Sequence, residues 1–219
     1  MDYHFWDTCW QRASQPFHLS EAHPFLRRYL YLLDNKEKLL LPLSGKSVDP
    51  IFLAQNNIHS TSIEFNPSAI DNFIIDSELS FKRKTFEQKK CYDFGDFDIW
   101  LADFFDIETK DIGKFSQVFD RAALVALPKE LRDKYIKHLK SLLQPKATIL
   151  MVTMDYEEGE MSGPPFYIAQ NELTELFPES SIRELDRISL INNHHRWKEL
   201  QLSKLDEVLF QINFNDLKT

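Results

Sequence analysis

The sequence predicts an α/β fold in which a mostly parallel sheet is covered by helices. From residue 38 onward, short apolar runs of strand length alternate with segments of helical periodicity, which is the order of elements typical of parallel sheets. Several of these runs are continuously apolar, as expected of strands that are buried on both faces. The composition, 43% hydrophobic and 27% charged, is that of an ordinary globular chain.

The first 34 residues predict helices only. Aromatic and apolar residues of 5–10 recur at helical spacing until Pro16 interrupts the pattern. A second amphipathic helix is expected from about residue 20 to residue 33. Neither segment has the spacing of a strand.

The elements that follow are predicted in strict order. Strands are expected at 38–43, 59–64, 97–101, 117–120 and 147–153, and helices at 47–54, 66–75, 128–143 and 170–177. Asn66 is suited to cap the second of these helices, with Pro67 at its first position. A hairpin at 81–93 and two final strands, 181–188 and 205–214, predict antiparallel additions, the last two forming the C-terminal edge of the sheet.

Charge, cysteines and chain organisation exclude several classes of protein. A net charge of −8 argues against a nucleic-acid binder, and no apolar run approaches the roughly 20 residues that span a bilayer. Residues 1–7 lack the pattern of a secretory signal, and the two cysteines fit a reducing compartment, so a cytoplasmic protein is expected. The cysteines and seven histidines show no metal-ligand spacing, and no metal is expected. No linker divides the chain, which predicts one domain over 1–219.

The ends of the first two strands predict a nucleoside site. Leu43 ends the first strand, and Glu64 follows about 20 residues later at the end of the second, where a carboxylate can accept hydrogen bonds from ribose hydroxyls. The glycine-rich fingerprint for a pyrophosphate is missing, which favours a nucleoside without phosphates and disfavours a nicotinamide-dependent reductase. A phosphate loop ending at Gly45 would need glycine where Leu40 stands, so a nucleotide triphosphatase is excluded.

Two further strand ends carry candidate residues. Asp103 and Phe104 suit an adenine ring, with the acid near its amine; the alternative is a helix cap followed by two core phenylalanines, Phe104 and Phe105. Arg121 follows the next strand, where it would face an anionic substrate or form a structural ion pair with a neighbouring carboxylate.

The chain resembles a known family in an ordered set of motifs. These are Phe5-Trp6 with Trp10, Phe17-His18, Pro42 to Ser47, Glu64, Asp103 to Phe105, Asp120 to Leu124, and Asp155-Tyr156 with Gly163 to Phe166. Together they are similar to the thiopurine S-methyltransferase family in its bacterial form, over nearly the whole chain. The resemblance implies a Rossmann-like, doubly wound fold with helices on both faces, S-adenosylmethionine as cofactor, and residues 1–34 as a helical lid.

The resemblance also implies roles for individual residues. The positions that match the family's cofactor contacts or its closing segment are Trp6, Trp10, Leu43, Glu64, Asp103, Phe104 and Arg121. Phe17 and Phe166 are expected to face the substrate, together with a basic residue near the poorly matching stretch 192–197, for which Arg196 is the candidate. Arg121 is the one residue expected to assist the reaction itself.

The expected reaction is methyl transfer to the sulfur of a small thiol by a monomeric enzyme. Sequence leaves other acceptors open, namely selenium, tellurium or halide species, or a nitrogen or oxygen, because acceptor choice resides in the loops that line the pocket. A non-catalytic protein that binds an adenosine nucleotide is the alternative outside enzymes.

Overall fold

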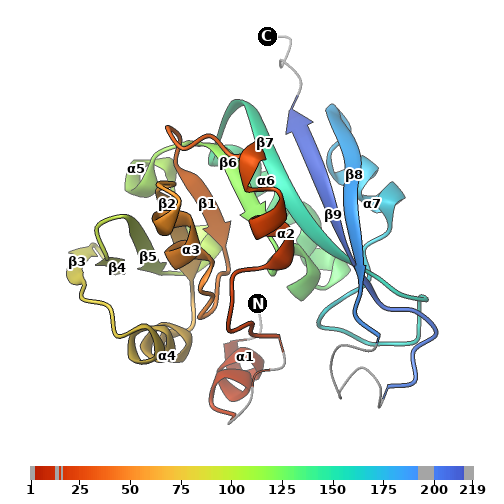
Figure 1. Cartoon of the computed structure of the whole chain (residues 1–219), viewed down its shortest axis with the longest axis horizontal. Coiled ribbons are helices and arrows are strands. Elements are labelled where there is room, and N and C mark those ends of the chain that lie inside the picture. The colour runs from red at the N-terminus through yellow and green to blue at the C-terminus, as the bar shows by residue number, and fades with distance from the viewer. Residues whose placement is uncertain (1–2, 13–14, 16, 192–199, 215–219) are drawn as a thin grey trace. The chain divides into compact units, whose positions relative to one another are not determined.

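The computed structural model describes residues 3–12, 15, 17–191 and 200–214 (Figure 1). The chain divides into two compact units, Met1–Phe115 and Ser116–Thr219. Each unit has strands and helices of its own.

The strands of the first unit combine a parallel set with an antiparallel hairpin. Their order is β3-β4-β5-β2-β1, with bounds β1 (Leu39–Pro42), β2 (Ser60–Glu64), β3 (Lys82–Phe86), β4 (Lys89–Asp93) and β5 (Phe97–Leu101). β1, β2 and β5 run parallel, and β3 and β4 are added antiparallel to them. Pro42 lies opposite Ile63, and Glu64 opposite Leu101, so the carboxyl ends of the three parallel strands lie side by side.

The helices of the first unit either precede the sheet or cross over it. They are α1 (Tyr3–Trp10), α2 (Pro24–Arg28), η1 (Leu30–Leu32), α3 (Asp49–Gln55), α4 (Pro67–Ser77), η2 (Phe104–Asp106) and α5 (Thr109–Ile112). α3 and α4 pack against β2 and β5. Phe73 of α4 lies edge-on to Phe97 of β5 in a buried cluster, and burial of each such side chain contributes about 1.5–3 kcal/mol. The side chain of Asn66 caps α4, and Pro67 occupies its first turn, as predicted.

The second unit holds the antiparallel C-terminal edge. Its strand order is β6-β7-β9-β8, with bounds β6 (Phe115–Asp120), β7 (Leu143–Asp155), β8 (Ser180–Ser189) and β9 (Asp206–Phe214). β9 pairs antiparallel with both β7 and β8. Its helices are η3 (Leu124–Ala126), α6 (Lys129–Ser141) and α7 (Gln170–Leu176). α6 buries Tyr135, Ile136 and Leu139 on one face.

The predicted α/β class is confirmed, including the parallel strands and the antiparallel C-terminal strands. The prediction of a single helix at 20–33 is wrong, because the structure has two shorter elements there, α2 and η1. Helix α2 begins at Pro24, because a nitrogen of the His23 ring accepts the N–H of Phe25 as a cap, and only a short 3₁₀ turn follows it. β7 is longer than expected because its polar first residues were not distinguishable from a loop in the sequence.

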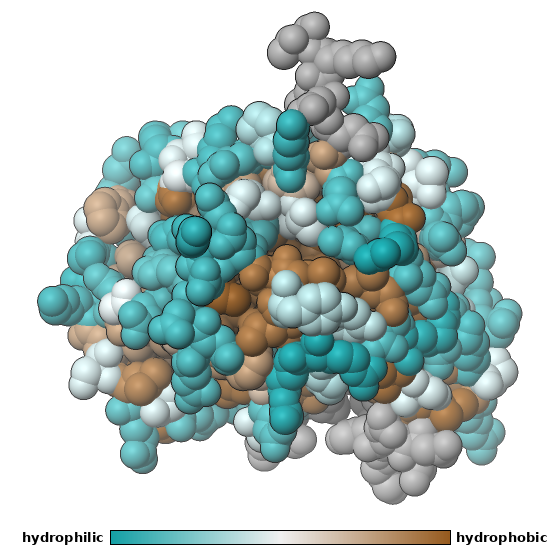
Figure 2. Space-filling view, turned by 45° about the horizontal axis from the view of Figure 1, so that its top comes forward, coloured by the Kyte–Doolittle hydropathy of each residue, from teal (hydrophilic) through white to brown (hydrophobic). Residues whose placement is uncertain are grey.

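Polar residues cover most of the surface that Figure 2 shows, with apolar residues gathered toward its middle. No helix in the described parts of the chain is long and apolar enough to cross a membrane. Within the same ranges, no three His, Cys, Asp or Glu side chains come together as metal ligands would.

Candidate active site

The turn after β1 has an unusual backbone. Leu43 has φ 48° and Gly45 has φ 58°, both in the left-handed region. For a leucine this conformation costs on the order of 1–3 kcal/mol, and such strain persists where the surroundings fix it, often at a functional site. The N–H of Ser44 donates to the carbonyl of Ile63 at 3.1 Å, which fastens the turn to the end of β2.

Glu64 closes β2 with a buried carboxyl group that is held at both oxygens. Oε2 accepts the N–H of Gly45 at 2.8 Å, and Oε1 accepts the N–H of Asn66 at 2.7 Å. Burial raises the pKa of Glu64 to about 7, against the lowering effect of the N–H groups of Asn66, Gly45 and Phe65. The side chain is therefore aimed and fixed, and its charge is sensitive to anything that binds beside it.

Aromatic side chains from α1 and the segment after it lie against the β1 turn. A Cβ atom added to Gly45 would come within 2.7 Å of the indole of Trp10, so the ring lies directly on the backbone there. The ring of Phe17 lies edge-on to Trp10 at 5.1 Å and to Trp6 at 5.8 Å between centroids. These three rings form an apolar wall beside the carboxyl ends of β1 and β2.

An adenosyl group, as expected from the resemblance, fits the residues at this strand end. Each oxygen of Glu64 accepts one backbone N–H and keeps a further lone pair, and two adjacent ribose hydroxyls are the matching donors. The hydroxyl of Ser44 is buried without a hydrogen-bond partner among the described residues. Only Gly45 would offer a bare backbone in this turn, so the site suits a nucleoside better than a pyrophosphate.

The end of β5 adjoins Glu64, because the N–H of Ala102 donates to the Glu64 carbonyl at 3.0 Å. Asp103 is exposed and caps η2, accepting the N–H of Phe105 at 2.9 Å. Phe104 is fully buried, with its ring edge-on to Phe105. The cap and a core Phe104 are as the alternative expected, whereas Phe105 is only partly buried, and an adenine-side role for Asp103 and Phe104 stays a prediction.

In the second unit, Arg121 follows β6 on a turn that Asp120 holds. Oδ1 of Asp120 accepts the N–H groups of Ala123 at 3.0 Å and Leu124 at 3.3 Å, and Oδ2 accepts the hydroxyl of Tyr135 at 2.7 Å. Burial raises the pKa of Asp120 to about 6, although Tyr135 and these N–H groups lower it. Sequence reasoning missed this anchor; an acidic residue directly before the candidate arginine was the available signal.

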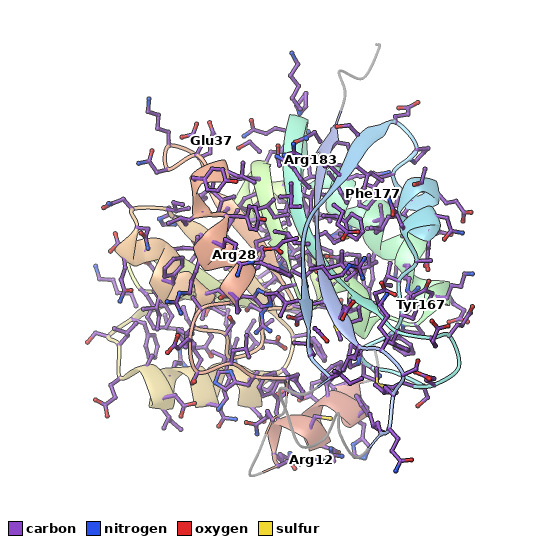
Figure 3. All side chains as sticks on the ribbon, turned by 45° about the vertical axis from the view of Figure 1, so that its right-hand side comes forward. Arg12, Arg28, Glu37, Tyr167, Phe177 and Arg183 are labelled. Carbon is purple, nitrogen blue, oxygen red and sulfur yellow. The ribbon has the colours of Figure 1, made fainter. Side chains whose placement is uncertain are left out.

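Phe166 lies on the loop after β7, held by several contacts of the same unit. Its N–H donates to the carbonyl of Val125 at 2.7 Å, and the guanidinium of Arg132 lies 5.9 Å from its ring centroid. The hydroxyl of Tyr156 donates to the carbonyl of Pro165 at 3.0 Å and accepts the N–H of Tyr167, labelled in Figure 3, at 2.7 Å. Phe166 is half-buried on a well-fixed loop. Arg196 lies outside the described residues.

The structure thus brings six of the predicted residues into the first unit's strand-end region: Trp6, Trp10, Phe17, Leu43, Glu64 and Asp103. Phe104 belongs to the same unit and is fully buried. The second unit carries Arg121 and Phe166, each on a turn fixed by its own neighbours.

Solved structures of other proteins share the fold of this chain. A S-adenosylmethionine-dependent methyltransferase from Anabaena variabilis has a TM-score of 0.67 and 13% sequence identity, covering 97% of this chain and 95% of that one. The N-methyltransferase NodS of Bradyrhizobium japonicum, solved with S-adenosylhomocysteine, has a TM-score of 0.63 and 14% identity, covering 98% of each chain. The chain therefore shares the fold of these S-adenosylmethionine-dependent methyltransferases.

Sequence comparison gives the family. The family model described as thiopurine S-methyltransferase matches residues 1–214. The thiopurine S-methyltransferase of Nitrosospira multiformis is 33% identical over 95% of this chain and 96% of its own, and that of Aliivibrio fischeri is 35% identical over 97% and 99%. The chain therefore belongs to the thiopurine S-methyltransferase family. It is an enzyme that uses S-adenosylmethionine, as the motifs predicted, and not a non-catalytic binding protein.

Proposed function

We propose that this enzyme transfers the methyl group of S-adenosylmethionine to the sulfur of small thiol compounds. The names of its relatives specify a sulfur acceptor. Arg121 adds a chemical reason, since a guanidinium favours the anionic form of a sulfur nucleophile. The observation that carries the proposal is the turn after β6, where the buried Asp120 fixes the backbone directly beside Arg121.

The residues of the first unit hold and orient the cofactor. When bound, S-adenosylmethionine supplies a methyl group that its sulfonium already activates. Glu64 accepts the ribose hydroxyls, Leu43 and Gly45 present backbone beside it, and Asp103 with Phe104 flanks the adenine. Alignment of two reactants in this way can supply roughly 7–11 kcal/mol of a reaction barrier, so positioning is the main task of the protein.

Arg121 lowers the pKa of the acceptor thiol. A thiolate is the stronger nucleophile, and an opposite charge within about 4–6 Å shifts a pKa by one to three units. The aromatic residues Trp6, Trp10, Phe17 and Phe166 exclude water, with residues 1–34 acting as a lid on a single catalytic domain. Arg196 is the proposed basic contact to the substrate.

Arg121→Gln tests the proposal directly. The substitution removes the charge and leaves a shorter polar side chain, so turnover of a thiol should fall most at acidic pH, where free thiolate is scarce. Arg121→Lys keeps a charge and should retain more of the activity. The measurement is a pH profile of methyl transfer from labelled cofactor; an equal loss at every pH argues against this role.

The acceptor itself is tested with a panel. Aromatic thiols, aliphatic thiols, a selenol, tellurite and halides are supplied at equal concentration with labelled S-adenosylmethionine. We expect the aromatic thiols to be methylated fastest. Preferential methylation of tellurite or a halide would replace the proposed acceptor class.

A further inference from the structure

We propose that Asp7 is a positioning residue that fastens α1 to the turn carrying Glu64, so that docking of α1 and binding of the cofactor stabilise each other. The proposal rests on the proposed position of the adenosyl group at Glu64. It does not depend on which atom accepts the methyl group.

Hydrogen bonds attach α1 to α4 and its cap. Oδ1 of Asp7 accepts hydrogen bonds from Asn66 Nδ2 and from Ser68 Oγ, both at 3.3 Å. At the other end of α1, the carbonyl of Trp10 accepts Asn72 Nδ2 at 3.4 Å. These contacts join both ends of α1 to α4 and its cap, and the carboxylate of Asp7 lies at the positive end of the α4 dipole.

Asn66 forms hydrogen bonds with Glu64, Ser68 and Asp7 at the same time. Its N–H donates to Glu64 Oε1, its side-chain oxygen caps α4 by accepting the N–H of Ser68 at 2.8 Å, and its side-chain nitrogen donates to Asp7. Asn66 is fully buried. A change in the position of Asp7 therefore acts on the group that holds one oxygen of Glu64.

A second link from α1 to Glu64 runs through Gly45. The indole of Trp10 lies on Gly45, and the N–H of Gly45 donates to Glu64 Oε2. Both oxygens of Glu64 are thus held by residues that α1 touches. An isolated helix as short as α1 is marginal in water, so its order depends on contacts of this kind.

Docking of α1 and binding of the cofactor affect each other equally, because the two equilibria are linked. If α1 must be docked for Glu64 to be fully aimed, then a cofactor bound at Glu64 favours the docked state by the same factor. The other oxygen of Asp7, Oδ2, accepts Gln11 Nε2 at 2.7 Å from the turn just after α1, so both oxygens of this carboxylate are held. Arg12, labelled in Figure 3, lies just beyond α1.

The test compares Asp7→Ala and Asp7→Asn with the parent, in the full-length enzyme. S-adenosylhomocysteine is titrated calorimetrically, and we expect its Kd to rise about five- to tenfold for Asp7→Ala and less for Asp7→Asn, which keeps an acceptor oxygen. Asp133→Ala is the matched control, because Asp133 is exposed on α6, and it should bind as the parent does.

A second readout measures the order of α1 directly, first without ligand and then with S-adenosylhomocysteine. Hydrogen exchange of the amides in 3–12 should be faster in Asp7→Ala than in the parent without any ligand, and S-adenosylhomocysteine should slow this exchange in the parent. Ser68→Ala removes the second donor and leaves the cap of α4 intact, so its effect on Kd should be less than additive with that of Asp7→Ala.

The outcomes separate this proposal from the thiol acceptor. Parent-like Kd and parent-like exchange of α1 in Asp7→Ala overturn the role of Asp7 and leave thiol methylation untouched. Failure to methylate any thiol, with a raised Kd in Asp7→Ala, overturns the acceptor and supports the role of Asp7. A Glu64→Ala variant that binds S-adenosylhomocysteine like the parent overturns both the cofactor position and this coupling.

Discussion

At Gly45, the left-handed backbone and the indole of Trp10 leave space for a hydrogen atom only. Gly45→Ala would add a Cβ about where the ring lies and would hold an L-residue at positive φ, which costs about 1–2 kcal/mol by itself. Because the Cβ must displace the ring of Trp10 or the turn that holds Glu64, we expect S-adenosylhomocysteine to bind about tenfold more weakly, a loss of about 1.4 kcal/mol. Calorimetric titration measures the change.

Gly95→Ala is the control for that substitution. Gly95 also has a positive φ, but a Cβ there would meet no atom within 4 Å. It shares the backbone cost without the contact to Trp10, so it should lower stability and leave cofactor binding unchanged. Equal losses of binding in the two variants would show that the ring contact is unimportant.

The hydroxyl of Tyr135 is the one side-chain donor to the buried Asp120 among the described residues. Tyr135→Phe removes that donor, and loss of a hydrogen bond to a buried charge costs about 1–3 kcal/mol. The pKa of Asp120 is already raised by burial, and this change raises it further. A carboxyl group whose pKa is higher in the folded than in the unfolded state contributes less to stability as the pH rises from the unfolded to the folded pKa.

The destabilisation by Tyr135→Phe should therefore be larger at pH 8 than at pH 5. Urea unfolding at both values measures it, with Tyr31→Phe as the control because Tyr31 is 75% exposed. A destabilisation of the same size at both pH values would mean that Asp120 does not titrate in this range.

At the scale of elements, an ion cluster ties the ends of β7, β8 and β9 together. Asp155, the last residue of β7, accepts Lys204 Nζ at 2.6 Å and also binds the guanidinium of Arg187 in β8. The same guanidinium reaches Asp206 of β9 at 3.2 Å. Burial raises the pKa of Asp155, but Lys204 and Arg187 outweigh it and hold this pKa below its usual value. The cluster lies at the base of the loop that carries Phe166.

Asp155→Asn should destabilise the enzyme by about 1–2 kcal/mol at pH 7. A depressed carboxyl pKa contributes stability above the usual value near 4, and this contribution is lost as pH falls through the lower folded value. The difference from the parent should consequently shrink below about pH 4. Denaturant unfolding across pH checks this, with the exposed neighbour Glu157→Gln as control; a difference that persists at pH 3 contradicts the ionic account.

Elements and site residues were predictable to different degrees. Strands such as Phe97–Leu101 follow from local apolar runs, and α4 follows from the adjacent Asn66 and Pro67, so sequence sufficed for them. Glu64 was found because its distance along the chain from the β1 turn is a regular property of this fold. The partners of Asp120 and Asp7 were not predictable, because Tyr135 and Asn66 are brought to them only by folding.

For the whole molecule, the raised pKa of Glu64, about 7, makes cofactor binding depend on pH. Only the carboxylate can accept two backbone N–H groups and two ribose hydroxyls, since the protonated form gives up one acceptor site. Binding therefore favours the ionised form, and the Kd of S-adenosylhomocysteine should rise on going from pH 8 to pH 6, approaching about tenfold per unit well below pH 7.

When S-adenosylhomocysteine binds near pH 6, Glu64 should release a proton. Calorimetric titration in two buffers with different ionisation enthalpies would measure how many protons are released. Glu64→Gln should bind weakly and without this pH dependence. A Kd that stays constant between pH 6 and pH 8 contradicts the role given to Glu64. The same raised pKa predicts that the free enzyme becomes less stable as pH rises from about 4 to 7.

The strand β3 has a consequence for how copies of this enzyme behave at high concentration. It lies at the end of the first unit's strand order, and every residue from Lys82 to Phe86 is exposed. Its free backbone groups could pair with the same strand of another molecule. Such a pairing would bring the like charges of Lys82, Arg83 and Lys84 of the two copies together. Replacing these cations with threonine would remove that repulsion, and the expected result is intermolecular sheet formation and precipitation.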